Sequence, residues 1–356
     1  MARMITGVDR TLAESGLPGL ESLGGEALNI ALGQALGPLA SARLEAHEQI
    51  KPRVLRLRFG VGPQVRSVVA KRMEPQHARR NELVIRRWLP ELGFGGAAPE
   101  LLGLAAERSG RWVWHVYEDL GPRELPSHDP EPEQLAAVVQ TIAAIHSRFA
   151  ADPVLAECRL HGESYGRSHF GSNVRDAIRA LEKLRPPHLS PSAEQAELRD
   201  RLLERLQSLL EEAPVRAVAL MRWGGPETLL HGDLWTTNTF VEPAADGPRV
   251  RLIDWDRAGV GPASYDVSTF LLRFAPEVRP GIMELYRRAM GAAGECLPAD
   301  RELNLLFETA ELARYANRLI WPALALRRDQ AVWGFDELAA VEQWFVALGP
   351  VLPEPA

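Results

Sequence analysis

The sequence contains few cysteines and lacks long apolar runs and runs of basic residues. Only Cys158 and Cys296 occur among 356 residues, and their separation gives neither a disulfide framework nor a metal-ligand spacing. No 18 consecutive residues are apolar, and the first 20 residues lack the apolar core of a secretory signal. The net charge is −6, with no basic stripe. We therefore expect a cytoplasmic globular protein whose partners include neither membrane nor nucleic acid. The sequence does not indicate an oligomeric state.

One stretch of the chain combines apolar strand patterns with polar loop residues. Residues 229–241 read LLHGDLWTTNTFV, and residues 250–256 read VRLIDWD. The segment between them, EPAADGPR, has the Pro, Gly and Asp-Gly chemistry of a turn. A hairpin of this kind is expected to bring together Asp233, Asn238 and Asp254.

These three residue types suit phosphoryl transfer. A carboxylate can orient an attacking hydroxyl and accept its proton, and this role falls to Asp233. The amide oxygen of Asn238 and the carboxylate of Asp254 are hard oxygen ligands of the kind that Mg²⁺ prefers. The Asp-x-x-x-x-Asn spacing followed by an Asp on a strand is that of a kinase catalytic loop and metal site.

With its His-Gly-Asp-x-x-x-x-Asn loop and Ile-Asp-Trp strand, the chain resembles the aminoglycoside phosphotransferase and choline kinase-like group of small-molecule kinases. The end of the loop, Trp-Thr-Thr-Asn at residues 235–238, also resembles the ecdysteroid kinase-like and fructosamine kinase-like branches. The resemblance implies an α+β, protein kinase-like fold of two lobes. Residues 1–120 would form an antiparallel, nucleotide-binding N-lobe, and residues 121–356 a mainly helical C-lobe. A polar hairpin in an unrelated α+β enzyme is the alternative.

Hydrophobic patterns predict the secondary structure of both lobes. In the first lobe, a helix is expected over 78–89, and strands over 27–35, 42–50, 54–59, 65–73, 101–105 and 112–117. In the second lobe, helices are expected over 133–150, 175–184, 194–212, 263–274, 281–293, 302–328 and 336–348.

The resemblance also implies a set of nucleotide-binding residues. Lys71 ends a Val-Val-Ala-Lys strand and would contact the α- and β-phosphates, with Glu82 of the next helix as its ion-pair partner and Glu91 as the alternative. The loop from Gly37 to Ser41, between the first two expected strands, would cover the phosphates, although an ordinary turn fits it equally well. The carbonyl of Tyr117 and the N–H of Asp119 would contact the adenine.

Other polar residues near the motif have supporting roles in this interpretation. His231 and Asp266 would brace the catalytic loop, and Asp256 is either a support for the metal or a polar residue at a strand end. His146 is interpreted as a structural histidine of its helix. The sequence does not decide whether any of them does more.

The predicted reaction transfers the γ-phosphate of ATP, with GTP as the alternative donor, to a hydroxyl of a small molecule. The acceptor is an aminoglycoside or another antibiotic in one interpretation, and a choline-, sugar- or sterol-like metabolite in the other. Glu308, Glu311 and Asp336 would suit an acceptor that carries an amine. A nucleotide-binding pseudokinase that acts as an interaction module is the alternative of another class.

Overall fold

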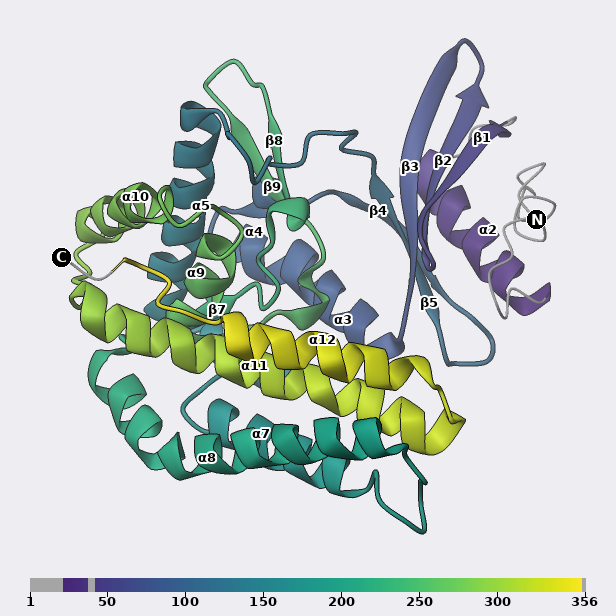
Figure 1. Cartoon of the computed structure of the whole chain (residues 1–356). Helices are drawn as coiled ribbons and strands as arrows, with labels where there is room; N and C mark the ends of the chain where they lie inside the picture. The colour runs from purple at the N-terminus through teal and green to yellow at the C-terminus, as the bar shows by residue number, and fades with distance from the viewer. Residues whose placement is uncertain (1–21, 38–41, 354–356) are drawn as a thin grey trace. The chain divides into compact units, whose positions relative to one another are not determined.

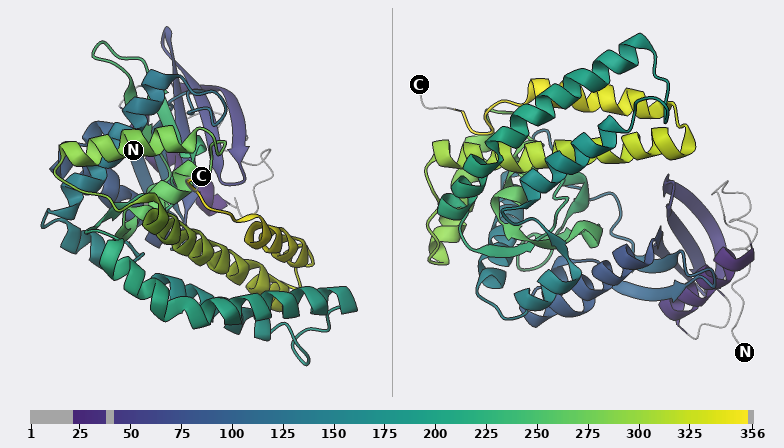
Figure 2. Two further views of the ribbon diagram at one scale, coloured as in Figure 1. Left: turned by 60° about the vertical axis from the view of Figure 1, so that its left-hand side comes forward. Right: turned by 90° about the horizontal axis from the view of Figure 1, so that it is seen from below.

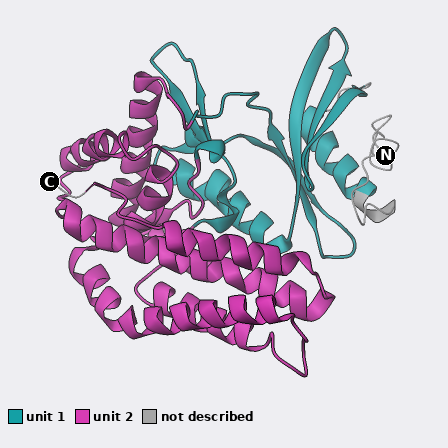
Figure 3. Ribbon diagram, in the orientation of Figure 1, with its two compact units in different colours: residues 1–126, 236–258 teal, residues 127–235, 259–356 magenta. Residues whose placement is uncertain are grey.

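The structure, a computed structural model, describes residues 22–37 and 42–353 (Figure 1). Contacts divide the chain into two compact units, which Figure 3 shows in different colours. The first contains residues 1–126 and 236–258, and the second contains residues 127–235 and 259–356. The hairpin with Asn238 and Asp254 is thus grouped with the N-terminal sheet, whereas the sequence analysis placed it in the second lobe. Within the described ranges, no helix is long and apolar enough to cross a membrane.

A five-stranded antiparallel sheet forms the centre of the first unit, in the order β1-β2-β3-β5-β4. Its strands are β1 (Ala42–Lys51), β2 (Val54–Val61), β3 (Gln64–Met73), β4 (Leu101–Ala106) and β5 (Val113–Glu118). In β2, the buried Leu55, Leu57 and Phe59 alternate with Arg56 and Arg58, so one face of the strand meets the core. The predictions of these five strands are confirmed.

The strand predicted over residues 27–35 is wrong, because this segment lies within helix α2 (Ser22–Leu36). The helix packs against β4 and β5 and buries Ala27, Leu28, Ala31 and Leu32, which have helical spacing. An apolar run of this length does not reveal its period, and its Ala and Leu residues favour a helix. β1 is therefore the first described strand.

A second helix of the first unit runs from Pro75 to Glu91 and contains a wide turn. It consists of α3 (Pro75–Leu83), a π-helical segment η1 (Val84–Trp88) and α4 (Leu89–Glu91). The N–H of Leu89 donates to the carbonyl of Val84, five residues earlier. Pro90 follows directly and has no N–H for the helical ladder, which agrees with a changed hydrogen-bond pattern at this point. The predicted helix is confirmed and is longer than expected.

The hairpin of the motif is anchored within the first unit. It consists of β8 (Thr239–Glu242) and β9 (Arg249–Leu252), flanked by the short 3₁₀ turns η3 (Thr236–Asn238) and η4 (Trp255–Arg257). Arg251 donates to the carbonyl of Ala98 at 2.7 Å, next to the 3₁₀ turn η2 (Gly95–Ala97), and forms an ion pair with Glu118 at 2.9 Å. These contacts fix the hairpin against the end of the sheet.

The second unit is mainly helical, with a small sheet in the order β6-β10-β7. Its strands are β6 (Glu163–Ser164), β7 (Glu227–Leu230) and β10 (Gly259–Pro262). Its helices are α5 (Pro132–Ala150), α6 (Leu155–His161), α7 (His169–Glu182), α8 (Ala193–Trp223), α9 (Ser264–Leu271), α10 (Arg279–Ala292), α11 (Asp300–Asp329) and α12 (Trp333–Ala347).

Helix α11 lies beside α7 and α12, and α8 lies along α7 (Figures 1 and 2). Their leucine and alanine side chains form one apolar core, which includes Leu202, Leu206, Leu312 and Leu319. The seven helices predicted for the second lobe are confirmed as α5, α7, α8, α9, α10, α11 and α12 of the second unit. α8 begins at a capping box of Ser192 and Gln195 and continues through Pro214, beyond its predicted end.

Candidate active site

The hairpin places the two predicted metal ligands next to each other in the first unit. Thr239 of β8 pairs with Leu252 of β9, and the N–H of Ile253 donates to the carbonyl of Asn238 at 2.9 Å. Asp254 is the next residue after Ile253, so backbone pairing alone fixes Asn238 and Asp254 side by side. Asn238 is buried and Asp254 is partly exposed.

Asp254 has a left-handed backbone conformation, with φ 70° and ψ 48°. Few residue types other than glycine adopt this conformation readily, and Asp and Asn are among them. It marks an abrupt change of chain direction between β9 and η4. The local backbone therefore favours the same two residue types that offer a side-chain oxygen to a metal.

Lys71, near the end of β3, contacts the carboxylates of Asp254 and Asp256. Its Nζ lies 3.2 Å from Oδ2 of Asp256 and hydrogen-bonds to Oδ1 of Asp254. Burial lowers the pKa of Lys71, but the charges of Asp254 and Asp256 outweigh this effect and raise the pKa above its ordinary value. Lys71 is therefore a fully charged ammonium group beside Asp254.

The structure does not bring Glu82 to Lys71, so the predicted ion pair is wrong. Glu82 contacts Arg79 at 3.3 Å and Arg86 at 3.5 Å on its own helix. The helix face that meets η4 instead carries Arg80, which donates to the backbone carbonyl of Asp256. Asp256, to which the sequence analysis gave no definite role, is a second carboxylate partner of Lys71.

The other predicted nucleotide contacts stay predictions. Residues 38–41, which include Ser41, lie outside the described residues, and the element that precedes Gly37 is helix α2 instead of the predicted strand. Tyr117 pairs with Val69 of β3 on one side and with Leu101 of β4 on the other. Asp119 follows the last paired residue of β5, and its carboxylate accepts hydrogen bonds from Ser67 and from the N–H of Gly121.

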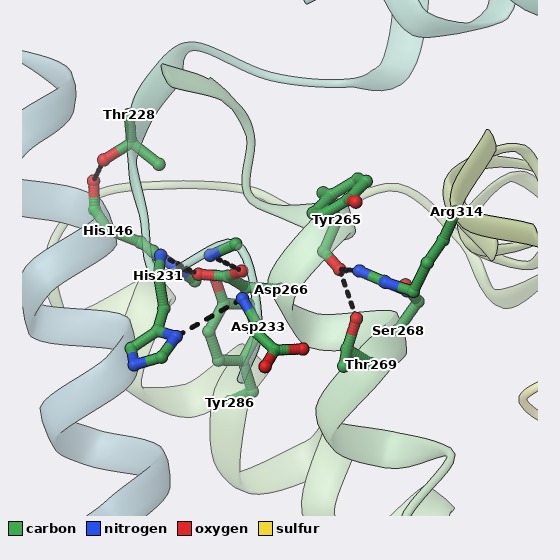
Figure 4. Close-up of polar contacts among 11 residues, drawn as sticks. His146, Thr228, His231, Asp233, Tyr265, Asp266, Ser268, Thr269, Tyr286 and Arg314 are labelled. Carbon is green, nitrogen blue, oxygen red and sulfur yellow. Dashed lines mark hydrogen bonds and ion pairs between the residues drawn. The ribbon is translucent and has the colours of Figure 1, made fainter. Parts of the chain in front are cut away.

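In the second unit, the loop that carries Asp233 is held by the buried carboxylate of Asp266 (Figure 4). Its two oxygens accept hydrogen bonds from the N–H groups of His231, at 2.6 Å, and Gly232, at 2.9 Å. The N–H of Asp233 donates to Nδ1 of His231 at 3.3 Å. The backbone N–H groups of three consecutive residues, ending at Asp233, are thus all hydrogen-bonded. This agrees with the predicted roles of His231 and Asp266 in bracing the loop.

His146 of α5 extends this network from behind the loop. Its Nε2 lies 3.5 Å from Asp266, its Nδ1 lies 2.8 Å from the hydroxyl of Tyr286, and its carbonyl accepts a hydrogen bond from Thr228 at 2.6 Å. Burial raises the pKa of Asp266, but the hydrogen bonds from His146 and from the backbone of His231, together with the electrostatic effect of these two residues, outweigh it and lower the pKa below its ordinary value. Asp266 is therefore an ionised, fully hydrogen-bonded support of the loop.

Replacement of Asp266 by Asn is expected to lower the free energy of unfolding by about 2–4 kcal/mol, because an amide N–H₂ would face buried N–H donors. The folded pKa of Asp266 is depressed. Its contribution to stability is therefore complete above the ordinary carboxyl pKa of about 4 and is lost as the pH falls through the lower folded pKa. Urea titrations between pH 3 and 8 measure this difference. The exposed Asp176 offers a control, and its Asn variant should change stability by less than about 0.5 kcal/mol. A loss for Asp266→Asn no larger than this would contradict the bracing role.

Several charged residues around Asp233 were not recognised from the sequence as a group. Arg314 of α11 hydrogen-bonds to the buried carboxylate of Glu311, and Arg273, just after α9, stacks on Trp235 with its Cζ 4.0 Å from the ring centroid. No local motif marks these arginines, because only the packing of α9 against α11 brings them near Asp233. The suggested use of Glu311 for an amine is also wrong, since Ser268 and Arg314 already occupy its carboxylate.

Solved structures with a similar fold are small-molecule kinases. An ethanolamine kinase from Plasmodium vivax is 12% identical with a TM-score of 0.60, covering 94% of this chain and 92% of that one. A spectinomycin phosphotransferase in complex with ADP and spectinomycin is 14% identical with a TM-score of 0.53, covering 85% and 92%. An aminoglycoside phosphotransferase from Streptomyces rimosus, in complex with ADP and streptomycin, is 18% identical with a TM-score of 0.50, covering 83% and 99%.

These likenesses confirm the two-part α+β fold of protein kinase type that the motif predicted. No curated protein matches the sequence. The profile of the phosphotransferase enzyme family, in contrast, matches residues 48–306. This range contains Lys71, the loop with Asp233, and the strand that ends at Asp254. Because the match covers well over half of the chain, the protein belongs to the phosphotransferase enzyme family.

Proposed function

We propose that this phosphotransferase transfers the γ-phosphate of ATP to a hydroxyl group of a small molecule, with Asp233 as the residue that orients the hydroxyl and accepts its proton. The observation that carries the proposal is the braced loop around Asp233. The buried Asp266 fixes the amides of His231 and Gly232, so the carboxylate of Asp233 is held on a rigid backbone. Positioning of this kind supplies much of the rate acceleration in phosphoryl transfer.

The residues of the hairpin fit a magnesium ion. Asn238 and Asp254 are adjacent and offer an amide oxygen and a carboxylate. Mg²⁺ commonly takes one or two protein ligands and completes its shell with water and nucleotide phosphates. When bound, the ion would offset negative charge on the phosphates.

Lys71 is suited to contact the nucleotide phosphates. Its ammonium group is kept charged by Asp254 and Asp256, and it lies beside the proposed ligand Asp254. A point charge at this place favours a triphosphate over a nucleoside without phosphates. ATP is the proposed donor because two of the similar structures hold ADP, and GTP is the alternative nucleotide.

The similar structures act on two kinds of acceptor. The spectinomycin and streptomycin complexes favour an antibiotic, whereas the ethanolamine kinase favours a small metabolite. An assay of nucleotide consumption tests the function, with Mg²⁺ and a panel of aminoglycosides, macrolides, choline, sugars and hydroxysteroids. Turnover that requires one acceptor and Asp233 supports the proposal. ATP binding without turnover across a broad panel would instead favour a pseudokinase.

A further inference from the structure

The charged side chains near Asp233 in the second unit differ in how many hydrogen-bond and ion-pair partners they have within the protein. Asp266, Arg273 and Arg314 lie close to Asp233 in this unit, and the carboxylate of Glu311 lies near both arginines. If the carboxylates were available, the site would suit a cationic acceptor, whereas an available guanidinium would suit an anionic one. The contacts of each group therefore indicate the charge of the acceptor.

Both carboxylates are occupied by internal partners. Glu311 is 1% exposed, and its Oε1 accepts hydrogen bonds from Ser268 at 2.7 Å and from Arg314. Asp266 is also 1% exposed, and it accepts hydrogen bonds from two backbone amides and contacts His146. Glu308, which lies one turn before Glu311 on α11, pairs with Arg216 at 3.3 Å. Asp266 and Glu311 are therefore closed to an ammonium group of an acceptor, whereas the side chain of Glu308 is partly exposed on α11.

Arg314 is held in a similar way. Its Nη1 donates to Glu311, and its Cζ lies 4.3 Å above the ring of Tyr265. Its Nη2 lies 3.3 Å from the carbonyl of Tyr265 (Figure 4). Burial lowers the pKa of Arg314, but the charge of Glu311 outweighs this effect and raises the pKa. Arg314 and Glu311 therefore form a buried ion pair in which each charge is balanced by the other.

Arg273 differs from Arg314 because it forms no ion pair within 4 Å among the described residues, and Glu311 and Asp233 act on it only from a longer distance. Its guanidinium stacks on Trp235, and its buried Nε has no hydrogen-bond partner among the described residues. Nearby Arg279, in contrast, donates its Nε to the carbonyl of Phe274 at 2.9 Å. A buried charged donor without an acceptor is costly, and an anion would relieve the cost. When an arginine stacks on an aromatic ring, its N–H groups still point outward in the plane of the guanidinium, where they can bind a carboxylate or phosphate.

The position of Trp235 connects Arg273 to the reaction. Trp235 is two residues after Asp233, its N–H donates to the carbonyl of Asp233 at 2.9 Å, and its side chain is 36% exposed. The negative charge of Asp233 also acts on the guanidinium of Arg273. Arg273 is thus near enough to Asp233 for both residues to contact the same acceptor molecule, the arginine at one group and Asp233 at the hydroxyl.

We propose that the acceptor is a small hydroxyl-bearing anion, a carboxylate or a phosphate ester, whose anionic group is bound by Arg273 on Trp235 while its hydroxyl faces Asp233. This inference rests on the proposed function and narrows its acceptor. The bond changes are those of phosphoryl transfer: the hydroxyl oxygen bonds to the γ-phosphorus, ADP leaves, and Asp233 takes the hydroxyl proton. Arg273 is a specificity residue in this scheme and does not contact the transferring group.

Matched probes of similar size test the charge of the acceptor. Rates of ADP release would be measured with glycerate, glycerol 3-phosphate, glycerol and ethanolamine, and with gluconate against sorbitol. We expect the anionic probes to be phosphorylated more efficiently than their neutral and cationic counterparts. The comparison of glycerate with glycerol 3-phosphate separates a carboxylate from a phosphate ester. Equal or better kcat/KM for the neutral or cationic probes would overturn the proposal.

The variant Arg273→Gln tests the residue. It should raise KM for the anionic probes on the order of 10- to 100-fold, which is typical of a lost charge-assisted hydrogen bond, and should leave KM for ATP unchanged. Arg318→Gln is the matched control, because Arg318 is exposed and pairs with Glu337 on the surface. An equal loss of kcat with anionic and neutral probes would assign Arg273 to the transferring phosphoryl group and would overturn the proposal.

Binding measurements cover the case in which none of these probes is turned over. The thermal unfolding midpoint of the wild-type protein should rise more in gluconate than in sorbitol, and this difference should disappear in Arg273→Gln but persist in Arg318→Gln. The absence of such a difference for all anionic probes would overturn the anion site. Binding of anions through Arg273 without any phosphorylation would leave the anion site standing and would count against the proposed function.

Discussion

Replacement of Asp233 by Asn is expected to lower kcat by two to four orders of magnitude, the range over which a positioned general base contributes. The amide cannot accept the hydroxyl proton, but it is close to the carboxylate in size and keeps the loop held by Asp266. Initial rates at saturating ATP and acceptor measure the effect. Since the nucleotide-binding residues are untouched, KM for ATP should stay within about threefold of the wild-type value. A near-normal kcat would remove Asp233 from the mechanism.

Replacement of Asp254 by Asn is expected to reduce turnover by at least two orders of magnitude at ordinary Mg²⁺ concentrations, because a carboxylate ligand and its charge are lost. Asn is the informative substitution here, since Asp254 has φ 70° and Asn tolerates this left-handed conformation better than Ala does. The fold should therefore persist, and circular dichroism would verify this.

Measuring the rate of the Asp254→Asn protein at increasing Mg²⁺ concentrations shows whether the variant binds the metal more weakly or no longer binds it. Partial recovery of the rate at high Mg²⁺ is expected if the carboxylate serves the metal. The neighbouring Asp256→Asn variant is the matched comparison, since its carboxylate contacts the same lysine. Unchanged turnover and an unchanged Mg²⁺ requirement in Asp254→Asn would refute the metal role of Asp254.

The parts of the site that depend on short sequence separations could be predicted from the sequence. Asp233, Asn238 and Asp254 lie in one loop and one hairpin, so residue spacing and turn chemistry were sufficient to place them on their elements. The strand β2 alternates clearly between buried and more exposed residues, and the predictions of the five strands of the first sheet are confirmed. The helix α2 was missed because its apolar run gives no clear period.

The parts that depend on the phase of a helix or on packing between distant elements could not be predicted. Glu82 was chosen for its charge, yet the helix turns it toward Arg79 and Arg86. The partnership of Lys71 with Asp256 and the stacking of Arg273 on Trp235 join elements that are far apart in the chain or unrelated by any motif. Composition and spacing contain no information about such pairs.

The wide turn at Val84–Trp88 affects how this helix should be aligned with those of other proteins. Each residue of a regular α-helix advances the chain by about 100°. An extra residue within one turn therefore rotates everything downstream by that angle unless the turn widens to absorb it. Here Arg80 meets η4 before the turn, and Leu89 is buried after it. An alignment that forbids gaps inside helices would thus shift one of these two faces by a residue and pair it with the wrong positions in distant homologues.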